Sequence, residues 1–199
     1  MAFYQEVFLN KSLIIFTDQA PQLGQSAVVL GKDFDTWASM IENLQHKQGS
    51  WICSGLSGTV EGDWEDFMSS FKIITAAGGR VMNENQDVLM IYRREKWDLP
   101  KGKVDEGETI VAAALREVKE ECGVHRLTLG LKLGIIYHLY HHKGQWVLKD
   151  THWYEMLGTM EDALIPQHEE DIQHITWMPS TENTWRANTY PSILKVMKW

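Results

Sequence analysis

The chain has 199 residues, 44% of them hydrophobic, and a formal net charge of −8 at pH 7. This acidic balance argues against general nucleic-acid binding, which depends on a positive surface, but it permits a local polyphosphate site. Two cysteines do not make a disulfide framework, and the absence of any run of 18 apolar residues argues against membrane spanning. Because Met1 does not open a secretory leader, we expect a cytoplasmic protein.

The N-terminal part alternates between extended and helical patterns and carries no chemical motif. The predicted elements are extended segments at 6–17, 27–30 and 51–53 and helices near 34–44 and 64–71. We expect residues 1–70 to form a small α/β unit of unknown role, joined to a domain that spans residues 71–199. This unit could cover an active site, form a homodimer or bind a partner, and the sequence leaves these alternatives open.

A basic run interrupts the acidic chain between Arg93 and Lys103, where five cationic side chains stand against two acids. Arg can bind phosphate through two hydrogen bonds, and Lys acts as a mobile point charge. We therefore predict a phosphate clamp, with a solvated basic loop as the alternative. The candidate phosphate-binding residues are Arg93, Arg94, Lys101 and Lys103, of which the two lysines are better placed than Arg93.

A helix is predicted over residues 110–122. Thr109 suits the N-cap, three consecutive alanines favour the helix, and Gly123 can end it. Helical spacing gathers an apolar stripe from Val111, Leu115, Val118 and Cys122. It places Glu117 and Glu121 on a neighbouring face, together with Ala113 and Ala114.

Glu117, Glu120 and Glu121 lie within one turn of this helix. Like charges three or four residues apart repel by roughly 0.2–0.5 kcal/mol per pair, so we expect something positive between them. A solvated acidic face is the ordinary explanation for such a cluster. A divalent metal is the alternative, because Mg²⁺ takes oxygen ligands.

Three further elements follow. Residues 137–156 predict a strand hairpin that turns at Lys143-Gly144, and the acidic loop 166–172 leads into a strand over 175–178. The stretch 184–198 predicts a helix interrupted near Pro191.

The spacing from Gly102 to Val124 gives the strongest indication of function. It runs Gly102, five residues, Glu108, seven residues, Arg116-Glu117-Val118, one residue, Glu120-Glu121, one residue, Gly123-Val124. This pattern resembles the Nudix box at every defined position, a match that average composition would give on the order of once in ten million chains of this length. The wider resemblance to Nudix hydrolases extends over residues 72–199.

The resemblance implies an α/β fold class, with a mixed β-sheet between helices in a Nudix sandwich. It also implies hydrolysis of a pyrophosphate bond in a nucleoside diphosphate-linked substrate, with Mg²⁺ or Mn²⁺. The implied metal-binding groups are Glu117, Glu120, Glu121 and a backbone carbonyl of Lys101 or Gly102. Glu121 and Glu117 are the leading catalytic candidates among them.

Two more roles follow from the resemblance. Arg116 and Glu108 are expected to form an ion pair that orients the metal-binding carboxylates, with an ordinary surface ion pair as the alternative. A base must take the proton from the attacking water, and Nudix enzymes draw it from the box or from a later loop. Glu170 is the first candidate and Glu169 the second, although an acidic loop is often only solvated.

The substrate stays open at this stage. The wording Trp97-Asp98-Leu99-Pro100-Lys101-Gly102 resembles hydrolases of dinucleoside polyphosphates, and less closely those of diphosphoinositol polyphosphates and capped RNA. ADP-sugars and oxidised nucleotides are further alternatives, because substrate choice depends on loops outside the box. A Nudix-like sensing domain that binds a nucleotide to regulate a partner is the competing class of function. The intact box glutamates count against it.

Overall fold

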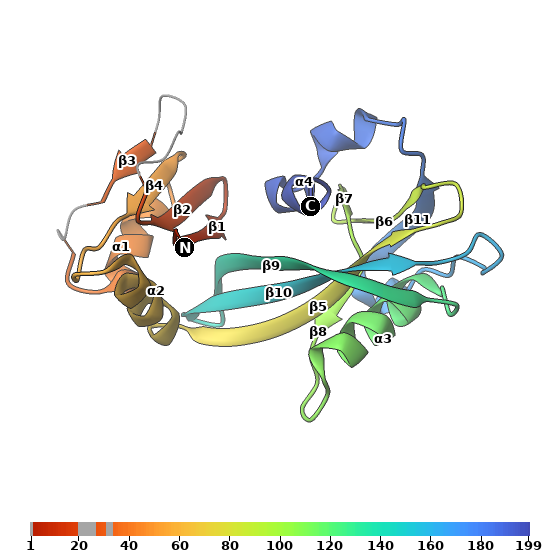
Figure 1. Cartoon of the computed structure of the whole chain (residues 1–199), viewed down its shortest axis with the longest axis horizontal. Helices are drawn as coiled ribbons and strands as arrows, with labels where there is room; N and C mark the ends of the chain where they lie inside the picture. Colours follow the sequence, from red (N-terminus) through yellow and green to blue (C-terminus); the bar gives the residue numbers. More distant parts are fainter. Residues whose placement is uncertain (1, 20–26, 31–33) are drawn as a thin grey trace. The chain divides into compact units, whose positions relative to one another are not determined.

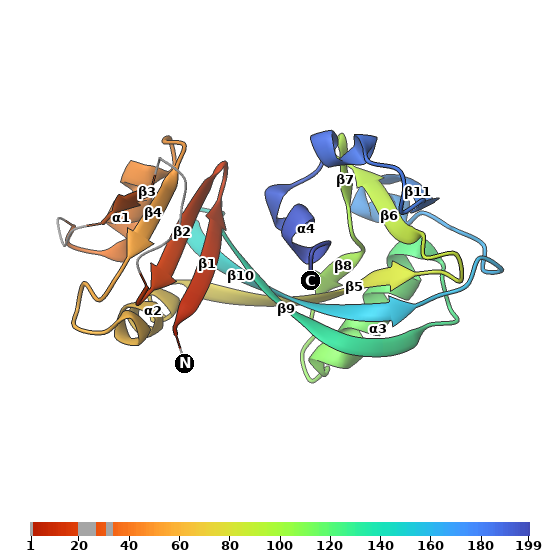
Figure 2. The ribbon, with the colours of Figure 1, turned by 45° about the horizontal axis from the view of Figure 1, so that its top comes forward.

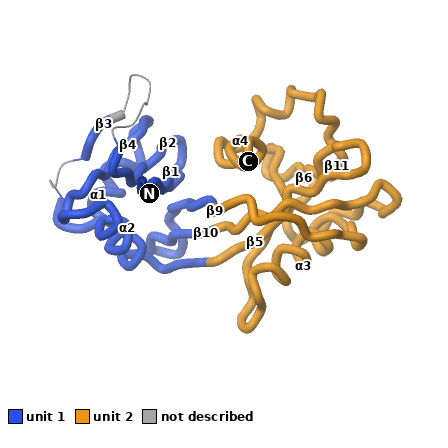
Figure 3. Tube along the Cα trace, viewed as in Figure 1, with its two compact units in different colours: residues 1–74, 136–150 blue, residues 75–135, 151–199 orange. Residues whose placement is uncertain are grey.

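The computed structural model describes residues 2–19, 27–30 and 34–199. The chain forms two compact units (Figure 3): unit 1 contains residues 1–74 and 136–150, and unit 2 contains residues 75–135 and 151–199. Three long strands take part in both units: β5 (Lys72–Met82), β9 (Thr128–His142) and β10 (Gln145–Leu157). The division into domains near residue 71 stays a prediction. The turn end of the β9–β10 hairpin belongs to unit 1.

Unit 1 is built on short strands. These are β1 (Tyr4–Leu9), β2 (Ser12–Thr17), β3 (Ala27–Val29) and β4 (Ser50–Cys53), which follow the order β9-β1-β2-β4-β3 within the unit. β1 and β2 pair antiparallel (Figure 2), whereas β4 is parallel to both β2 and β3. The single extended segment predicted over 6–17 is therefore wrong. Asn10 adopts a positive φ of 54° and turns the chain, a conformation that asparagine tolerates well.

Two capped helices cover the unit 1 strands. Helix α1 (Trp37–Leu44) begins three residues later than predicted, because the Thr36 hydroxyl accepts a hydrogen bond from the Ser39 amide and fixes the N-cap there. Helix α2 (Val60–Ser69) begins earlier than predicted, since Thr59 caps it in the same way through the Gly62 amide. Both helices start where a threonine can accept from the backbone.

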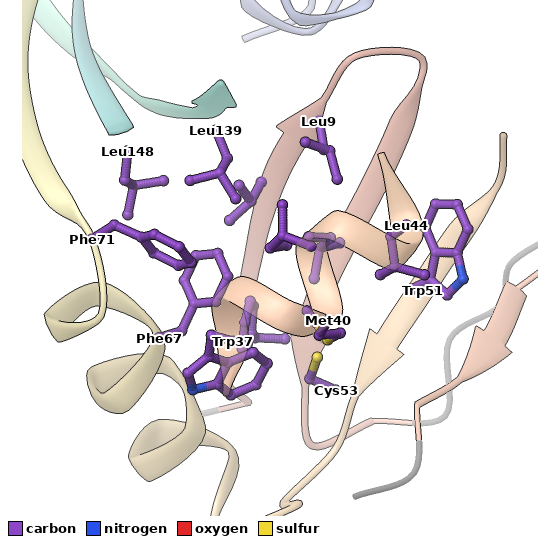
Figure 4. Close-up of a cluster of buried hydrophobic side chains, with 14 of the residues drawn as sticks. Leu9, Trp37, Met40, Leu44, Trp51, Cys53, Phe67, Phe71, Leu139 and Leu148 are labelled. Carbon is purple, nitrogen blue, oxygen red and sulfur yellow. The ribbon is translucent and has the colours of Figure 1, made fainter. Parts of the chain in front are cut away.

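Aromatic side chains dominate the core of unit 1. Phe67 is fully buried, and its ring centroid lies 5.0 Å from that of Phe16, 5.3 Å from that of Trp37 and 4.9 Å from that of Phe71. Leu148 of β10 belongs to the same buried cluster (Figure 4). The hairpin end therefore contributes to this core.

Unit 2 holds the residues of the predicted box. Its strands follow the order β11-β6-β5-β10-β9, with β7 paired to β6 and β8 paired to β5. The new elements are β6 (Val88–Arg93), β7 (Lys96–Asp98), β8 (Lys101–Lys103), α3 (Ile110–Cys122), η1 (His168–Glu170), β11 (Ile172–Met178), η2 (Thr184–Asn188) and α4 (Pro191–Val196). α3 and α4 lie on opposite sides of the unit 2 strands (Figure 1). The mixed sheet between helices is thus confirmed.

The later elements occur where they were predicted, although β9 and β11 begin before residues 137 and 175 and the helix predicted over 184–198 divides into η2 and α4. Lys143 and Gly144 both have positive φ and turn the β9–β10 hairpin, and Pro191 opens α4 at the position where a helix tolerates proline. Among the described residues, no helix has both the length and the apolar character needed to cross a bilayer.

Candidate active site

Helix α3 has the predicted bounds, Ile110–Cys122. The Thr109 hydroxyl accepts from the Ala112 amide at 3.2 Å, and Gly123 ends the helix with a φ of 75°, which a residue with a Cβ adopts only with strain. The predicted helix is confirmed at both ends.

The buried face of α3 differs from the predicted stripe. Val111 and Leu115 are only partly buried, whereas Ala113, Ala114 and Glu121 are buried together with Val118 and Cys122. Small side chains let the helix approach the sheet closely: a Cβ added to Gly79 of β5 would lie 3.2 Å from Val118 Cγ2. The face that carries Ala113, Ala114 and Glu121 is therefore buried, whereas Val111 and Leu115 of the predicted stripe lie at its edge.

Arg116 supplies the positive charge expected between the glutamates. Its guanidinium makes two hydrogen bonds of 2.9 Å to Glu108, as predicted for that pair. Through Nη1 it also donates to Glu117 at 2.8 Å and to Glu120 at 2.9 Å. The bonds from Arg116 lower the pKa of Glu108 below its ordinary value. The guanidinium therefore forms hydrogen bonds with three carboxylates of the box.

Residue 102 must be a glycine because the Glu117 carboxylate occupies the space that a Cβ would fill. A Cβ on Gly102 would overlap the Glu117 carboxylate, so this carboxylate lies directly against the backbone of β8. β8 is held there by antiparallel pairing to β5, with Gly102 opposite Ala77. Burial raises the pKa of Glu117 despite the opposing effect of Arg116.

Glu121 is separated from the other two glutamates by its burial. It is 1% exposed, accepts a 2.8 Å hydrogen bond from the Lys101 amide, and lies 3.6 Å from Arg93 Nη1. Burial raises the pKa of Glu121, an effect that Lys101 and Arg93 counteract.

A hard divalent cation suits this donor set. Glu117, Glu120 and Glu121 offer carboxylate oxygens, and the carboxylate of Glu117 touches the Gly102 backbone, whose carbonyl is a further oxygen donor. In the part of the chain that the structure describes, no three such side chains already converge on one point. Arg116 draws Glu117 and Glu120 to one side, while the Lys101 amide and Arg93 hold Glu121 on the other. Joint binding would require side-chain rotation.

The predicted phosphate clamp divides into two pairs. Lys101 Nζ lies 3.0 Å from Asp98 and Arg93 Nη2 lies 3.2 Å from the same carboxylate, so both side chains point into the protein. Arg94 is exposed and lies 3.6 Å from Asp171, and Lys103 is exposed as well. Burial therefore supports a phosphate-binding role for Arg94 and Lys103 more than for Arg93 and Lys101.

Glu170 lies at the end of η1, beside the box. Asp98 and Glu121 raise the pKa of Arg93, burial raises the pKa of Glu117, and the negative charge of Glu170 adds to both shifts. Strand pairing brings η1 to the end of β6, because Ile172 at the start of β11 is opposite Arg93. Asp98 was not singled out from the sequence. A single acid between Trp97 and Leu99 gives no signal of the two cations that the fold brings to it.

Comparisons with known proteins identify the family to which residues 72–199 belong. A family model described as "NUDIX domain" matches residues 72–199. An 8-oxo-(d)GTP phosphatase of Mycolicibacterium smegmatis is 33% identical over 114 residues, which cover 56% of this chain and 33% of that protein. Nucleoside diphosphate-linked moiety X motif 6 of Xenopus laevis is 30% identical over 120 residues, covering 58% of this chain and 54% of that protein. The chain thus spans from 33% to 54% of the length of these two relatives.

Solved structures show the same fold. An Ap4A hydrolase of C. elegans aligns with a TM-score of 0.50 at 23% identity, over 63% of this chain and 93% of that one. A dihydroneopterin triphosphate pyrophosphohydrolase of E. coli aligns with a TM-score of 0.51 at 20% identity, over 62% of this chain and 92% of that one. Because the family model covers more than half of the sequence and the complete box lies within it, the chain belongs to the NUDIX family.

Proposed function

We propose that this chain hydrolyses a phosphoanhydride bond in a nucleoside diphosphate-linked substrate with the help of Mg²⁺ or Mn²⁺. The observation that carries the proposal is the arrangement around Arg116, where Glu108, Glu117 and Glu120 surround one guanidinium beside the Gly102 backbone. A cluster of carboxylates suits a polyphosphate substrate, because metal cations held by the carboxylates offset the negative charge of the phosphate oxygens.

The ion would be held by Glu117, Glu120 and Glu121 with the carbonyl of Gly102 or Lys101. When bound, it supplies positive charge to the phosphates and makes water a better nucleophile. Arg116 keeps Glu117 and Glu120 together and limits their mutual repulsion. Its two bonds to Glu108 fix the guanidinium plane, which an ordinary single-contact surface pair would leave free to rotate.

The remaining roles fall to groups at the edge of this cluster. In this proposal Glu170 takes the proton from the attacking water. Its place at the end of η1, next to the β11–β6 pairing that includes Arg93, supports this role. The exposed cations Arg94 and Lys103 bind the outer phosphates in this scheme. Arg93 and Lys101 act indirectly, because Arg93 forms an ion pair with Glu121 and the Lys101 backbone amide donates a hydrogen bond to it.

Two substrate classes compete within the proposal. The sequence from Trp97 to Gly102 favours dinucleoside polyphosphates, and an Ap4A hydrolase shares the fold. Relatives named as phosphatases of 8-oxo-(d)GTP and 8-oxo-dGDP favour oxidised nucleotides instead. Both classes carry a phosphoanhydride next to a nucleoside, so one site chemistry serves either. A cytoplasmic location and a homodimer remain expectations that accompany the proposal.

The test is product analysis in ¹⁸O-labelled water with Mg²⁺, on diadenosine tetraphosphate, 8-oxo-dGTP, ADP-ribose, diphosphoinositol phosphate and capped RNA. We expect one of the first two to be cleaved, with the label on a single phosphorus. Glu121→Gln should abolish most turnover while near-UV circular dichroism stays unchanged, because the variant removes one charge without changing side-chain volume. A wild-type chain that binds these compounds and cleaves none would favour a sensing domain.

A further inference from the structure

Four largely buried charged side chains form a network of ion pairs between α3 and the strands of unit 2. Arg93 closes β6, Asp98 ends β7, Lys101 begins β8 and Glu121 comes from α3. Asp98 Oδ2 lies 3.0 Å from Lys101 Nζ and 3.2 Å from Arg93 Nη2. The other arm of the same guanidinium, Nη1, lies 3.6 Å from Glu121 Oε1. This network holds two positive and two negative groups, so its formal charges balance.

Asp98 is held by its backbone pairing and by a local hydrogen bond, as well as by the two cations. Its Oδ1 accepts a 2.8 Å hydrogen bond from the Leu99 amide, and its backbone is opposite Ile91 in the β6–β7 pairing. The side chain is 6% exposed. Although burial alone would raise the pKa of Asp98, Lys101 and Arg93 bring it below its ordinary value. Two cations and one backbone amide therefore hold the Asp98 carboxylate in place.

The two cations next to Glu121, Arg93 and Lys101, need a second negative group to balance their charge. It already accepts the Lys101 amide and faces Arg93. If Asp98 were neutral, only the Glu121 carboxylate would remain to balance the two positive charges of Arg93 and Lys101. Burying ions is costly when no opposite charge balances them. A divalent cation approaching Glu121 would then meet a local excess of positive charge.

We propose that Asp98 is a positioning residue that keeps Glu121 available to a divalent cation by engaging Arg93 and Lys101. The inference rests on the proposed function in taking Glu121 as a ligand, and it adds a residue outside the box to the metal site. Residues that orient metal ligands typically change metal affinity by about 10- to 100-fold when they are altered.

Charge balance gives a test that differs from a merely structural role. Mn²⁺ titration of the full chain, followed by the electron paramagnetic resonance signal of free Mn²⁺, should be run on Asp98→Asn, Lys101→Met and the double variant. Asp98→Asn keeps the side-chain shape and should weaken Mn²⁺ binding by about 10- to 100-fold. Lys101→Met removes one cation, keeps the backbone amide that bonds Glu121, and should leave the affinity equal or tighter.

The double variant decides the question. With one cation and one anion removed, the remaining Arg93 and Glu121 balance again, so Mn²⁺ affinity should return toward that of the wild type. Removing both partners of a buried ion pair can also restore stability, so the thermal unfolding of all three variants is measured as well. A structural role predicts Mn²⁺ affinities that only follow the melting temperatures, whereas the role of Asp98 predicts an affinity loss in Asp98→Asn at temperatures where that variant is fully folded. Affinity of Asp98→Asn within about twofold of the wild type, or a double variant weaker than the single one, would overturn the role of Asp98.

Two controls separate this inference from folding and from the proposed function. Asp162→Asn removes an anchoring carboxylate that contacts Arg126 elsewhere in unit 2, and it should leave Mn²⁺ affinity unchanged. Should Asp98→Asn fail to fold, a tenfold loss in Lys101→Met would still contradict the proposal and a retained or tighter affinity would support it. A wild type that binds Mn²⁺ but cleaves no substrate refutes the proposed function alone. One that binds Mn²⁺ and cleaves substrate, but whose Mn²⁺ affinity does not change in Asp98→Asn, refutes the role of Asp98 alone.

Discussion

Glu169 and Glu170 are neighbours in the same short 3-10 turn, yet the charge of Glu170 acts on Arg93 and Glu117. We expect Glu170→Gln to lower kcat by about 100-fold, because a positioned general base typically contributes 10²–10⁴-fold. Glu169→Gln is the matched control and should keep nearly full activity. Single-turnover rates with Mg²⁺ would measure both, and equal losses in the two variants would contradict the assignment.

Gly102 offers a second test at the level of one atom. Gly102→Ala places a methyl group where the Glu117 carboxylate lies, so that carboxylate must move and Mn²⁺ affinity should fall at least about tenfold. Gly107→Ala is the contrasting variant, because its Cβ would meet no atom within 4 Å while its φ of 78° strains any alanine. It should cost about 1–2 kcal/mol of stability and leave Mn²⁺ affinity unchanged. Thermal unfolding and Mn²⁺ titration together separate the two effects.

Sequence patterns predicted elements better than they predicted faces. The bounds of α3 followed from its caps, because Thr109 and Gly123 act through local backbone geometry. The buried face did not follow, since apolar periodicity cannot show that Gly79 lets the alanines approach the sheet or that Arg93 draws Glu121 inward. Long-range contacts also determine which of the predicted phosphate-binding side chains face the solvent. Asp98 turned Lys101 and Arg93 away from solvent, and that pairing depends on where β7 and β8 join the sheet.

The loop after α3 provides a pH-dependent element. Asp162 accepts from the backbone amides of His125 and Arg126, each at 2.8 Å, and from Arg126 Nε at 2.9 Å. These bonds, led by that from the Arg126 amide, lower its pKa below the ordinary value of 3.8. A lowered folded-state pKa stabilises the fold above that ordinary value, and the contribution is lost as pH falls through the folded-state pKa.

Asp162→Asn should therefore melt at a lower temperature than the wild type at pH 7. The two melting temperatures should converge as the pH is lowered below 3.8, where the wild-type carboxylate also becomes protonated. Differential scanning calorimetry across this range measures the difference. A gap that stays constant down to acid pH would show that Asp162 acts through packing and not through its charge.

At the scale of the whole molecule, β10 contributes to two separate cores. Leu148 is fully buried in the cluster of unit 1, and Met156, on the same strand, is fully buried in the cluster of unit 2. Replacing either by alanine should cost about 2–5 kcal/mol, because each change leaves a cavity in a packed core. The two variants differ in which core they loosen.

Hydrogen exchange of the two variants should show this difference. Leu148→Ala should lose protection first in α1, α2 and residues 136–150, since these segments share its cluster. Met156→Ala should lose it first in α3 and β11, whose residues pack around Met156. If Leu148→Ala instead loosened α3 as much as α1, residues 136–150 would belong energetically to unit 2. The boundary near residue 71 would then describe folding better than the two compact units do.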